Sequence, residues 1–202
     1  MFLVSLKPEN FLNDGILKAE FSDGSSSLLI SGYLPEGFDP VSRELTARDE
    51  EALAYAAACY RAEKSALRLI ARAEQHSLGL TAKLERRGHD AAVARTVVSG
   101  LLDRNLLDDT RYAELWVRSR LSAKKALTPR WLFASLAKRG IKRVFSQKAM
   151  NTVLDEEAEF TLLLRYIKKA GTLNGKGVIS LKKHLKNEGF SLAVIERYLN
   201  IF

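Results

Sequence analysis

A short pattern that ends in glycine occurs three times and constrains the fold of this chain more than any other feature. It reads LERRG at 84–88, LAKRG at 136–140 and LKNEG at 185–189, so the glycines are 52 and 49 residues apart. Each glycine follows an apolar helical pattern and suits the position just after a helix, where the backbone is left-handed. Apolar residues recur five, ten and thirteen positions after each glycine: Val93, Phe145 and Val194; Val98, Met150 and Leu199; Leu101, Val153 and Phe202.

A period near 50 residues predicts tandem repeats of three helices, in which stacked neighbours complete each other's core. The first helix of each repeat is expected at Ser65–Gln75, Asp108–Ser122 and Asp155–Lys169. We therefore predict a mainly α protein whose repeats form an elongated, curved array. The predicted divisions are an N-terminal β-hairpin extension at 1–44, a connector helix at 45–63, and three-helix repeats at 64–106, 107–154 and 155–202.

The first 44 residues have strand patterns instead of helical ones. Residues 16–21 alternate between apolar and polar side chains, the Ser-Asp-Gly-Ser segment at 22–25 favours a turn, and 28–33 form a second apolar run. Residues 2–6 could add a third strand. Because so small a unit is not stable alone, it is expected to dock on the helices or to pair with another chain. The connector helix would begin with Thr46 as its N-cap.

The helices of the second repeat have clear starts. Asp108 is a suitable N-cap for 109–122, and Thr128 followed by Pro129 begins the next helix. The first of these helices places Tyr112, Ala113, Leu115, Trp116 and Val117 on one apolar face.

Two residues of these helices break the amphipathic pattern. Arg120 falls within the apolar face of 109–122, where it would either snorkel or pair with a carboxylate, or else meet a partner. In the next helix the predicted core residues are Leu132, Phe133, Leu136 and Ala137, whereas Trp131, Ser135 and Lys138 point away. Trp131 has two interpretations: packing against a neighbouring helix or loop, or a stacking or interface anchor.

Charge is distributed very unevenly along the chain. The net charge is +8, yet residues 1–45 carry three basic and seven acidic side chains, and 115–154 contain ten Lys or Arg and no acid. A solvated surface normally mixes both signs, so the sequence favours a polyanion or an acidic protein surface as partner. The candidate contact residues are Arg118, Arg120, Lys124, Lys125, Arg130, Trp131, Lys138, Arg139, Lys142 and Arg143.

Other functional classes find little support in the sequence. The three histidines are far apart, and the glycine-containing segment 171–177 lacks the spacing of a phosphate loop, so we read it as a turn. Cys59, the single cysteine, cannot form an internal disulfide and is expected in the core. We expect no enzyme, cofactor or metal site. The N-terminus lacks signal-peptide features and no apolar stretch is long enough for a membrane span, so we expect a cytoplasmic protein.

One stretch also resembles a known family. LLDDTRYA at 106–113, followed by VRSRL at 117–121, is similar to the central signature of the RecX regulatory proteins, which modulate the bacterial recombinase RecA. The resemblance implies three tandem three-helix units, with the hairpin as an extension. The third repeat matches least, and Trp131 stands where the family pattern after the proline is usually basic.

What the resemblance implies for function is non-enzymatic binding to RecA–single-stranded DNA filaments. Such binding would inhibit ATP hydrolysis, strand exchange and filament growth, and so modulate DNA repair, recombination and the SOS response. The basic residues would face RecA or single- or double-stranded DNA, and we expect a monomer. The alternative is a non-specific DNA-binding regulatory protein that acts directly on DNA, although the helices after Gly88 and Gly140 lack base-reading side chains at their starts.

Overall fold

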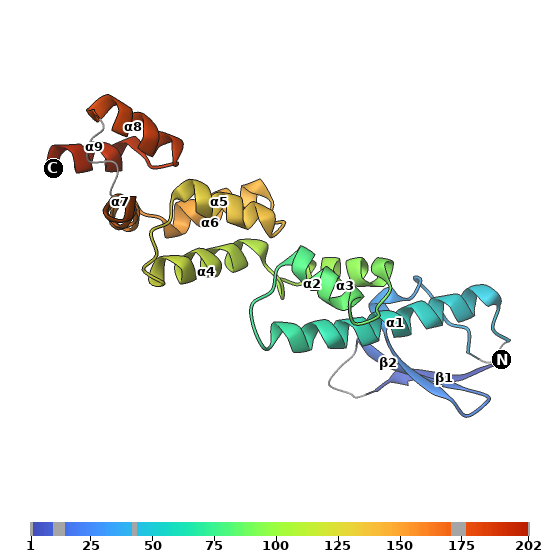
Figure 1. Cartoon of the computed structure of the whole chain (residues 1–202). Helices are drawn as coiled ribbons and strands as arrows, with labels where there is room; N and C mark the ends of the chain where they lie inside the picture. The colour runs from blue at the N-terminus through green and yellow to red at the C-terminus, as the bar shows by residue number, and fades with distance from the viewer. Residues whose placement is uncertain (1, 10–14, 42–43, 171–176, 202) are drawn as a thin grey trace. The chain divides into compact units, whose positions relative to one another are not determined.

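The computed structural model describes residues 2–9, 15–41, 44–170 and 177–201, which fold as two compact units, Met1–Leu107 and Asp108–Phe202. The described residues are mainly helical, with one small sheet near the N-terminus (Figure 1). The fold is thus mainly α with a small N-terminal β element, as the sequence predicted. Residues 171–176, which we read as a turn, lie outside the described residues, as does Phe202.

The N-terminal sheet has three antiparallel strands in the order β1-β2-β3, namely Leu3–Pro8, Ile16–Phe21 and Ser26–Ile30. The pairing register sets Leu6 opposite Ala19 and Ala19 opposite Ser27. The optional third strand of the sequence analysis is therefore real. The chain then forms a short 3-10 turn, η1, at Ser31–Tyr33 instead of continuing the last strand to residue 33.

The long helix α1, Ala47–Ile70, lies between the sheet and two further helices, α2 (Ser77–Glu85) and α3 (Ala91–Asp103) (Figure 1). Its first half packs Leu53, Ala56 and Ala57 against Leu3 and Leu29 of the sheet. Its second half packs against α2 and α3 in a core that contains Cys59, Ala62, Ala66, Leu80, Leu84, Val97 and Leu101. One helix thus belongs to both cores.

The continuity of α1 corrects the sequence prediction. We expected a connector helix at 45–63 and a separate helix at Ser65–Gln75, but residues 47–70 form one helix. The physical reason is that the junction, Arg61-Ala62-Glu63-Lys64, consists entirely of good helix formers and contains no breaker. Thr46 is the N-cap, as predicted, and forms a capping box with Asp49.

A polar contact also joins the N-terminal segment to the helices of the first unit. Glu63, which is buried, accepts a hydrogen bond from the Tyr33 hydroxyl at 3.0 Å and forms an ion pair with Arg104 at 2.8 Å. Tyr33 follows the sheet, Glu63 is on α1 and Arg104 caps α3. Burial, and then the charge of Glu63, raise the pKa of Tyr33.

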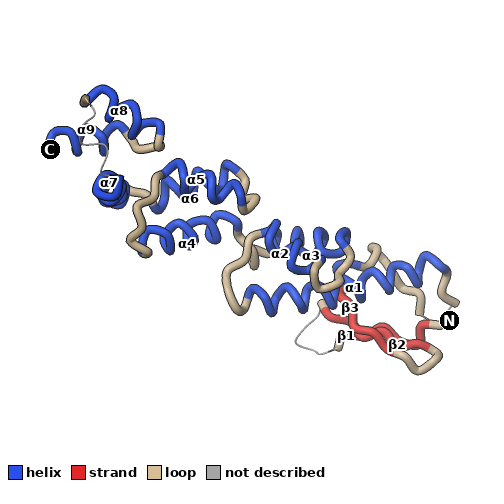
Figure 2. The backbone as a smooth tube through the Cα atoms, viewed as in Figure 1, coloured by secondary structure: helices blue, strands red, loops and turns tan. Residues whose placement is uncertain are grey.

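In the second unit, the described residues form only helices and loops (Figure 2). The helices are α4 (Asp109–Ser122), α5 (Pro129–Lys138), α6 (Arg143–Val153), α7 (Glu156–Ala170), α8 (Val178–Asn187) and α9 (Leu192–Ile201). All six contribute to one hydrophobic core, which includes Trp116, Leu132, Met150, Leu163, Leu185 and Ile195. The further division of this unit into repeats at 107–154 and 155–202 stays a prediction.

The helix ends agree with the repeated pattern in the sequence. Gly88, Gly140 and Gly189 have φ values of +85°, +78° and +89°, the left-handed conformation that the pattern predicted. Asp108 accepts two backbone N–H bonds at the start of α4, and Thr128 accepts one at the start of α5. Local sequence chemistry therefore sets where these helices begin and end.

The predicted core faces of α4 and α5 need correction. Leu115 of α4 is 48% exposed, because the buried stripe is narrower than predicted and consists of Ala113, Trp116 and Val117. On α5, Ser135 is buried and Ala137 is exposed, the reverse of the prediction. Leu132, Ser135 and Leu136 follow ordinary helical spacing and form the buried stripe of α5. The prediction was wrong because it assigned burial by hydropathy, and Ser135 is polar.

Candidate functional site

The two tryptophans of the chain lie together on the second unit. The rings of Trp116 on α4 and Trp131 on α5 stack with centroids 6.1 Å apart and an interplanar angle of 24°. Trp116 is 8% exposed, whereas Trp131 is 45% exposed. Trp131 therefore packs on a neighbouring helix, as the first interpretation has it, and keeps a large exposed aromatic surface. A role as a stacking or interface anchor stays a prediction.

Two of the candidate basic residues pack on Trp116. The guanidinium carbon of Arg139 lies 4.5 Å from a Trp116 ring centroid, and that of Arg120 lies 5.1 Å away. This is cation–π geometry. Packing on an aromatic ring thus explains the position of Arg120 within an apolar face. The pairing with a carboxylate that we considered from the sequence is not what holds it. Arg139 also donates to the Ser135 carbonyl at 2.8 Å.

Arg130, at the start of α5, is held by the end of α8. Its backbone N–H donates to the Glu188 carbonyl at 3.0 Å, and its guanidinium donates to the Asn187 carbonyl at 3.3 Å. Its side chain stays exposed. Arg120, Arg130 and Arg139 therefore have structural contacts of their own, besides any role at a surface.

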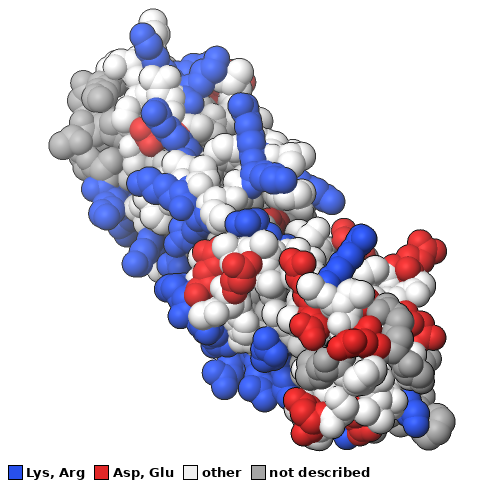
Figure 3. Space-filling view, turned by 90° about the vertical axis from the view of Figure 1, so that its right-hand side faces the viewer, with Lys and Arg blue, Asp and Glu red and all other residues white. Residues whose placement is uncertain are grey.

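The other six candidate cations are all exposed. They differ from these three because, among the described residues, their side chains have no hydrogen bond, ion pair or ring contact such as hold Arg120, Arg130 and Arg139. We call the six the free basic set: Arg118, Lys124, Lys125, Lys138, Lys142 and Arg143. In the space-filling view, Lys and Arg cover much of the visible surface of residues 108–202, in the upper part of the picture (Figure 3). The absence of acids from 115–154 in the sequence is thus expressed on the surface of this unit.

Lys124 of the free basic set has an unusual backbone. Its φ of +51° lies in the left-handed region, which non-glycine residues rarely adopt. It follows the end of α4, where its N–H donates to the Leu121 carbonyl at 3.3 Å. A cation therefore stands where glycine would be easier to accommodate.

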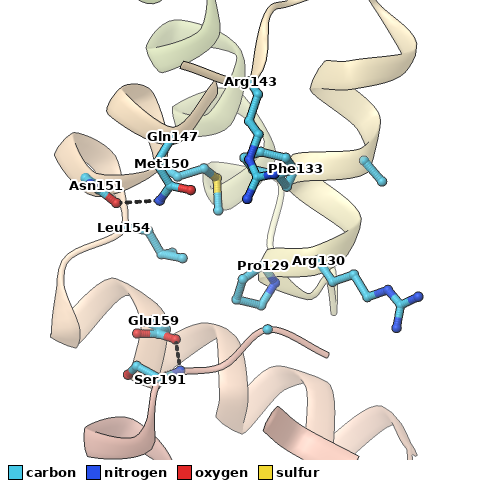
Figure 4. A pocket seen from close by; sticks show the side chains of 12 residues that line it. Pro129, Arg130, Phe133, Arg143, Gln147, Met150, Asn151, Leu154, Glu159 and Ser191 are labelled. Atoms are coloured by element: carbon cyan, nitrogen blue, oxygen red, sulfur yellow. Dashed lines mark hydrogen bonds between the residues drawn. The ribbon is translucent and has the colours of Figure 1, made fainter. Parts of the chain in front are cut away.

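A cleft of about 590 Å³ lies in the second unit, between α5, α6 and the segment that leads into α9 (Figure 4). Phe133, Met150 and Leu154 give it an apolar floor, and Arg143 lines it from the start of α6. Sequence reasoning missed this cleft, although it named Arg130 and Arg143 as candidates. The lining residues come from both predicted repeats of this unit, so no local pattern indicates that they meet.

Two of the three histidines, His76 and His184, and the cysteine have structural contacts or burial that explain them. The imidazole of His76 caps α2 by accepting the Gly79 N–H at 3.2 Å. His184 shares a 3.0 Å hydrogen bond with the Tyr166 hydroxyl. Cys59 is fully buried, and burial raises the pKa of its thiol. Over the described ranges, no three or more His, Cys, Asp or Glu side chains gather as a metal site would require.

Comparison with known proteins places the chain in a family. No protein-family model matches it. Regulatory protein RecX of Treponema pallidum (strain Nichols) is 33% identical over 150 residues, which cover 74% of this chain and 90% of that protein. The chain belongs to the RecX family. A RecX of Caldanaerobacter subterraneus is 24% identical over 140 residues, covering 69% of this chain and 70% of that protein.

Solved RecX structures share the fold. A crystal structure of regulatory protein RecX superposes with a TM-score of 0.67 at 18% identity and covers 96% of this chain and 97% of that one. RecX from Lactobacillus salivarius has a TM-score of 0.53 at 20% identity and covers 71% and 95%. Among the described residues of this RecX family member, every helix is too short or too polar to cross a bilayer.

Proposed function

We propose that this RecX family member is a non-enzymatic regulator that binds RecA–single-stranded DNA filaments. On binding it would inhibit ATP hydrolysis, strand exchange and filament growth, and so modulate DNA repair and recombination. Family membership supports a regulator, and the name of the family fits RecA as target. The observation that carries the proposal on this chain is the free basic set, which lies within forty residues that contain no acid.

The chemistry of the free basic set suits a polyanion. Lysine and arginine side chains that neutralise phosphates release condensed counterions, so binding is strong at low salt and weakens as salt rises. Such contacts position a protein on nucleic acid without reading its bases. A filament that carries single-stranded DNA offers phosphates of this kind, and the exposed ring of Trp131 could add a stacking or protein contact.

The test is the single-stranded-DNA-dependent ATPase rate of RecA with this protein added at substoichiometric amounts. A basic-set variant would change Arg118, Lys124, Lys125 and Lys142 to Gln. We expect strong inhibition by the native protein and a loss of potency of about tenfold or more in the variant, because several phosphate contacts are removed. Arg120 is kept in the basic-set variant, because replacing it would also remove its contact with the Trp116 ring.

A matched control changes four exposed arginines of the first unit, Arg61, Arg68, Arg72 and Arg95, to Gln. The control variant has the same change in net charge as the basic-set variant. An equal loss of inhibitory potency in both would mean that inhibition depends on the overall charge of the protein and not on the free basic set. Inhibition kept in the basic-set variant would move the contact surface elsewhere. No effect of the native protein on RecA, together with salt-sensitive binding to bare DNA, would favour the plain DNA-binding regulator.

A further inference from the structure

We propose that the cleft of the second unit binds a short acidic peptide segment of a protein partner, anchored by one large apolar side chain. The volume of about 590 Å³ lies in the range of about 300–1,000 Å³ that is usual for ligand pockets. It therefore has room for a leucine or phenylalanine side chain together with part of the peptide that carries it.

The floor of the cleft is apolar and adaptable. Phe133 comes from α5, and Met150 and Leu154 come from α6 and its end. Methionine fills irregular contacts and is common at surfaces that accept varied apolar side chains. This lining provides a site in which one apolar anchor of a partner would be desolvated, the usual location of a binding hot spot.

The rim of the cleft carries hydrogen-bonding groups suited to a peptide backbone. Gln147 and Asn151 are one turn apart on α6, are exposed, and are joined by a 2.9 Å hydrogen bond from the Gln147 amide to Asn151 Oδ1 (Figure 4). The pair leaves amide donors and acceptors for the N–H and C=O groups of an extended segment.

The charge around the cleft favours acidic residues beside the anchor. Arg143, at the start of α6, lines the cleft and forms no ion pair within the described ranges, and Arg130 extends outward on the α5 side (Figure 4). The carboxylate in the cleft, Glu159, already accepts the Ser191 N–H at 2.6 Å and lies on the opposite side from Arg143. The Arg143 guanidinium therefore remains available to a partner carboxylate, and Arg130 can offer only the N–H groups that its hydrogen bond to the Asn187 carbonyl leaves unused.

The lining favours a peptide over a nucleobase. Sequence-tolerant base binding depends on exposed aromatic faces, and this cleft has one aromatic residue, Phe133, which is only partly exposed among aliphatic neighbours. The exposed stacking surface of this unit, Trp131, does not line the cleft. The inference goes beyond the proposed function, because it concerns a different class of ligand and a cleft that shares only Arg143 with the free basic set.

The test uses the full chain and a dye-labelled peptide, Asp-Glu-Asp-Leu-Phe-Glu-Asp, in fluorescence anisotropy. Two control peptides replace Leu-Phe by Gly-Gly, or replace every acid by its amide. We expect binding of the first peptide and an affinity at least about tenfold lower for each control, since burial of a large apolar side chain and charge-assisted hydrogen bonds each contribute that much.

Variants of the protein then locate the site. Ala134 is exposed and lines the cleft, so Ala134→Phe should fill it and weaken binding by at least about tenfold. Ala137→Phe is the matched control, because Ala137 is exposed on the same helix and does not line the cleft. Arg143→Gln should weaken binding, and Arg95→Gln on the first unit should not. Urea unfolding, followed by tryptophan fluorescence, checks that each variant is folded.

Three results would overturn the inference. They are failure of the acidic apolar peptide to bind, equal binding of the Gly-Gly peptide, and unchanged binding to a folded Ala134→Phe variant. As a fourth overturning result, binding of a dye-labelled oligothymidylate that is lost in the folded Ala134→Phe variant would assign the cleft to nucleic acid instead. The peptide assay contains neither RecA nor DNA at the start, so a failure to bind the peptide would not contradict the proposed function. A failure to inhibit RecA would likewise not contradict peptide binding in the cleft.

Discussion

The backbone N–H of Arg130 donates a 3.0 Å hydrogen bond to the carbonyl oxygen of Glu188 and so joins the start of α5 to the end of α8. The next residue, Gly189, has a φ of +89°, and a Cβ added there would lie 3.0 Å from the Arg130 nitrogen. This contact links two segments that are 58 positions apart in the chain. The close approach of backbone to backbone is possible because residue 189 has no side chain.

Replacing this glycine tests the junction. Gly189→Ala should lower the free energy of unfolding of the second unit by about 2 kcal/mol, because left-handed strain and a clash with the α5 backbone act together. Tryptophan fluorescence in urea measures it, since both tryptophans lie in this unit.

The matched control for the junction is Gly88→Ala. Gly88 has a φ of +85°, but nothing lies within 4 Å of an added Cβ, so only the strain of about 1 kcal/mol is expected. The reactivity of the buried Cys59 thiol during urea unfolding reports the first unit. Equal losses at the two glycines would show that the contact with Arg130 has no energetic weight.

Stability and charge can be separated at Lys124. Lys124→Gly should raise the free energy of unfolding of the second unit by about 0.5–1 kcal/mol, because glycine tolerates the φ of +51°, whereas Lys124→Ala should leave it nearly unchanged. Both variants remove one cation of the free basic set, so both should inhibit RecA less. A glycine variant that is less stable than native would contradict the strain argument.

Arg139 should behave as a structural residue. Arg139→Ala removes the guanidinium 4.5 Å from the Trp116 ring and should cost about 1 kcal/mol of stability in urea unfolding, with greater quenching of tryptophan emission by acrylamide. The neighbouring Lys138→Ala, at an exposed position, should stay within about 0.5 kcal/mol of native. Similar small effects at both positions would mean that the ring contact contributes nothing.

Tyr33 makes the first unit sensitive to alkaline pH. Its pKa is raised in the folded protein, chiefly by burial and then by the charge of Glu63. Above about pH 10 the unfolded chain therefore loses the tyrosine proton first, and stability falls as pH rises toward the folded pKa. Thermal unfolding followed by circular dichroism between about pH 9 and 11.5 should show a steeper loss for native protein than for Tyr33→Phe. Parallel curves would exclude Tyr33 as the cause.

Local chemistry made much of the fold predictable. The caps at Thr46, Asp108 and Thr128 and the three glycine turns were read correctly because each depends on a few adjacent residues. The boundary inside α1 was wrong because repeat spacing suggested a break that helix propensity does not support.

The site was less accessible to sequence reasoning. The sequence shows that 115–154 is basic, but it does not show which of these cations have contacts within the fold. Arg120 and Arg139 contact Trp116 only because α4 and α5 pack together. The cleft was missed for the same reason, because Phe133 and Ser191 are brought to one opening by tertiary contacts alone. Whether the ten candidate residues contact RecA or DNA stays a prediction.

The single helix α1 restricts how chains of this kind can diverge. One residue inserted between Ala57 and Ala62 would turn everything before it by about 100° around the helix axis relative to α2 and α3. The sheet would then lose its alignment with Glu63, and the Tyr33 hydroxyl would no longer donate its hydrogen bond to the Glu63 carboxylate. Length changes should therefore accumulate in the turn between α1 and α2, while the helix itself keeps a fixed number of residues between its two cores.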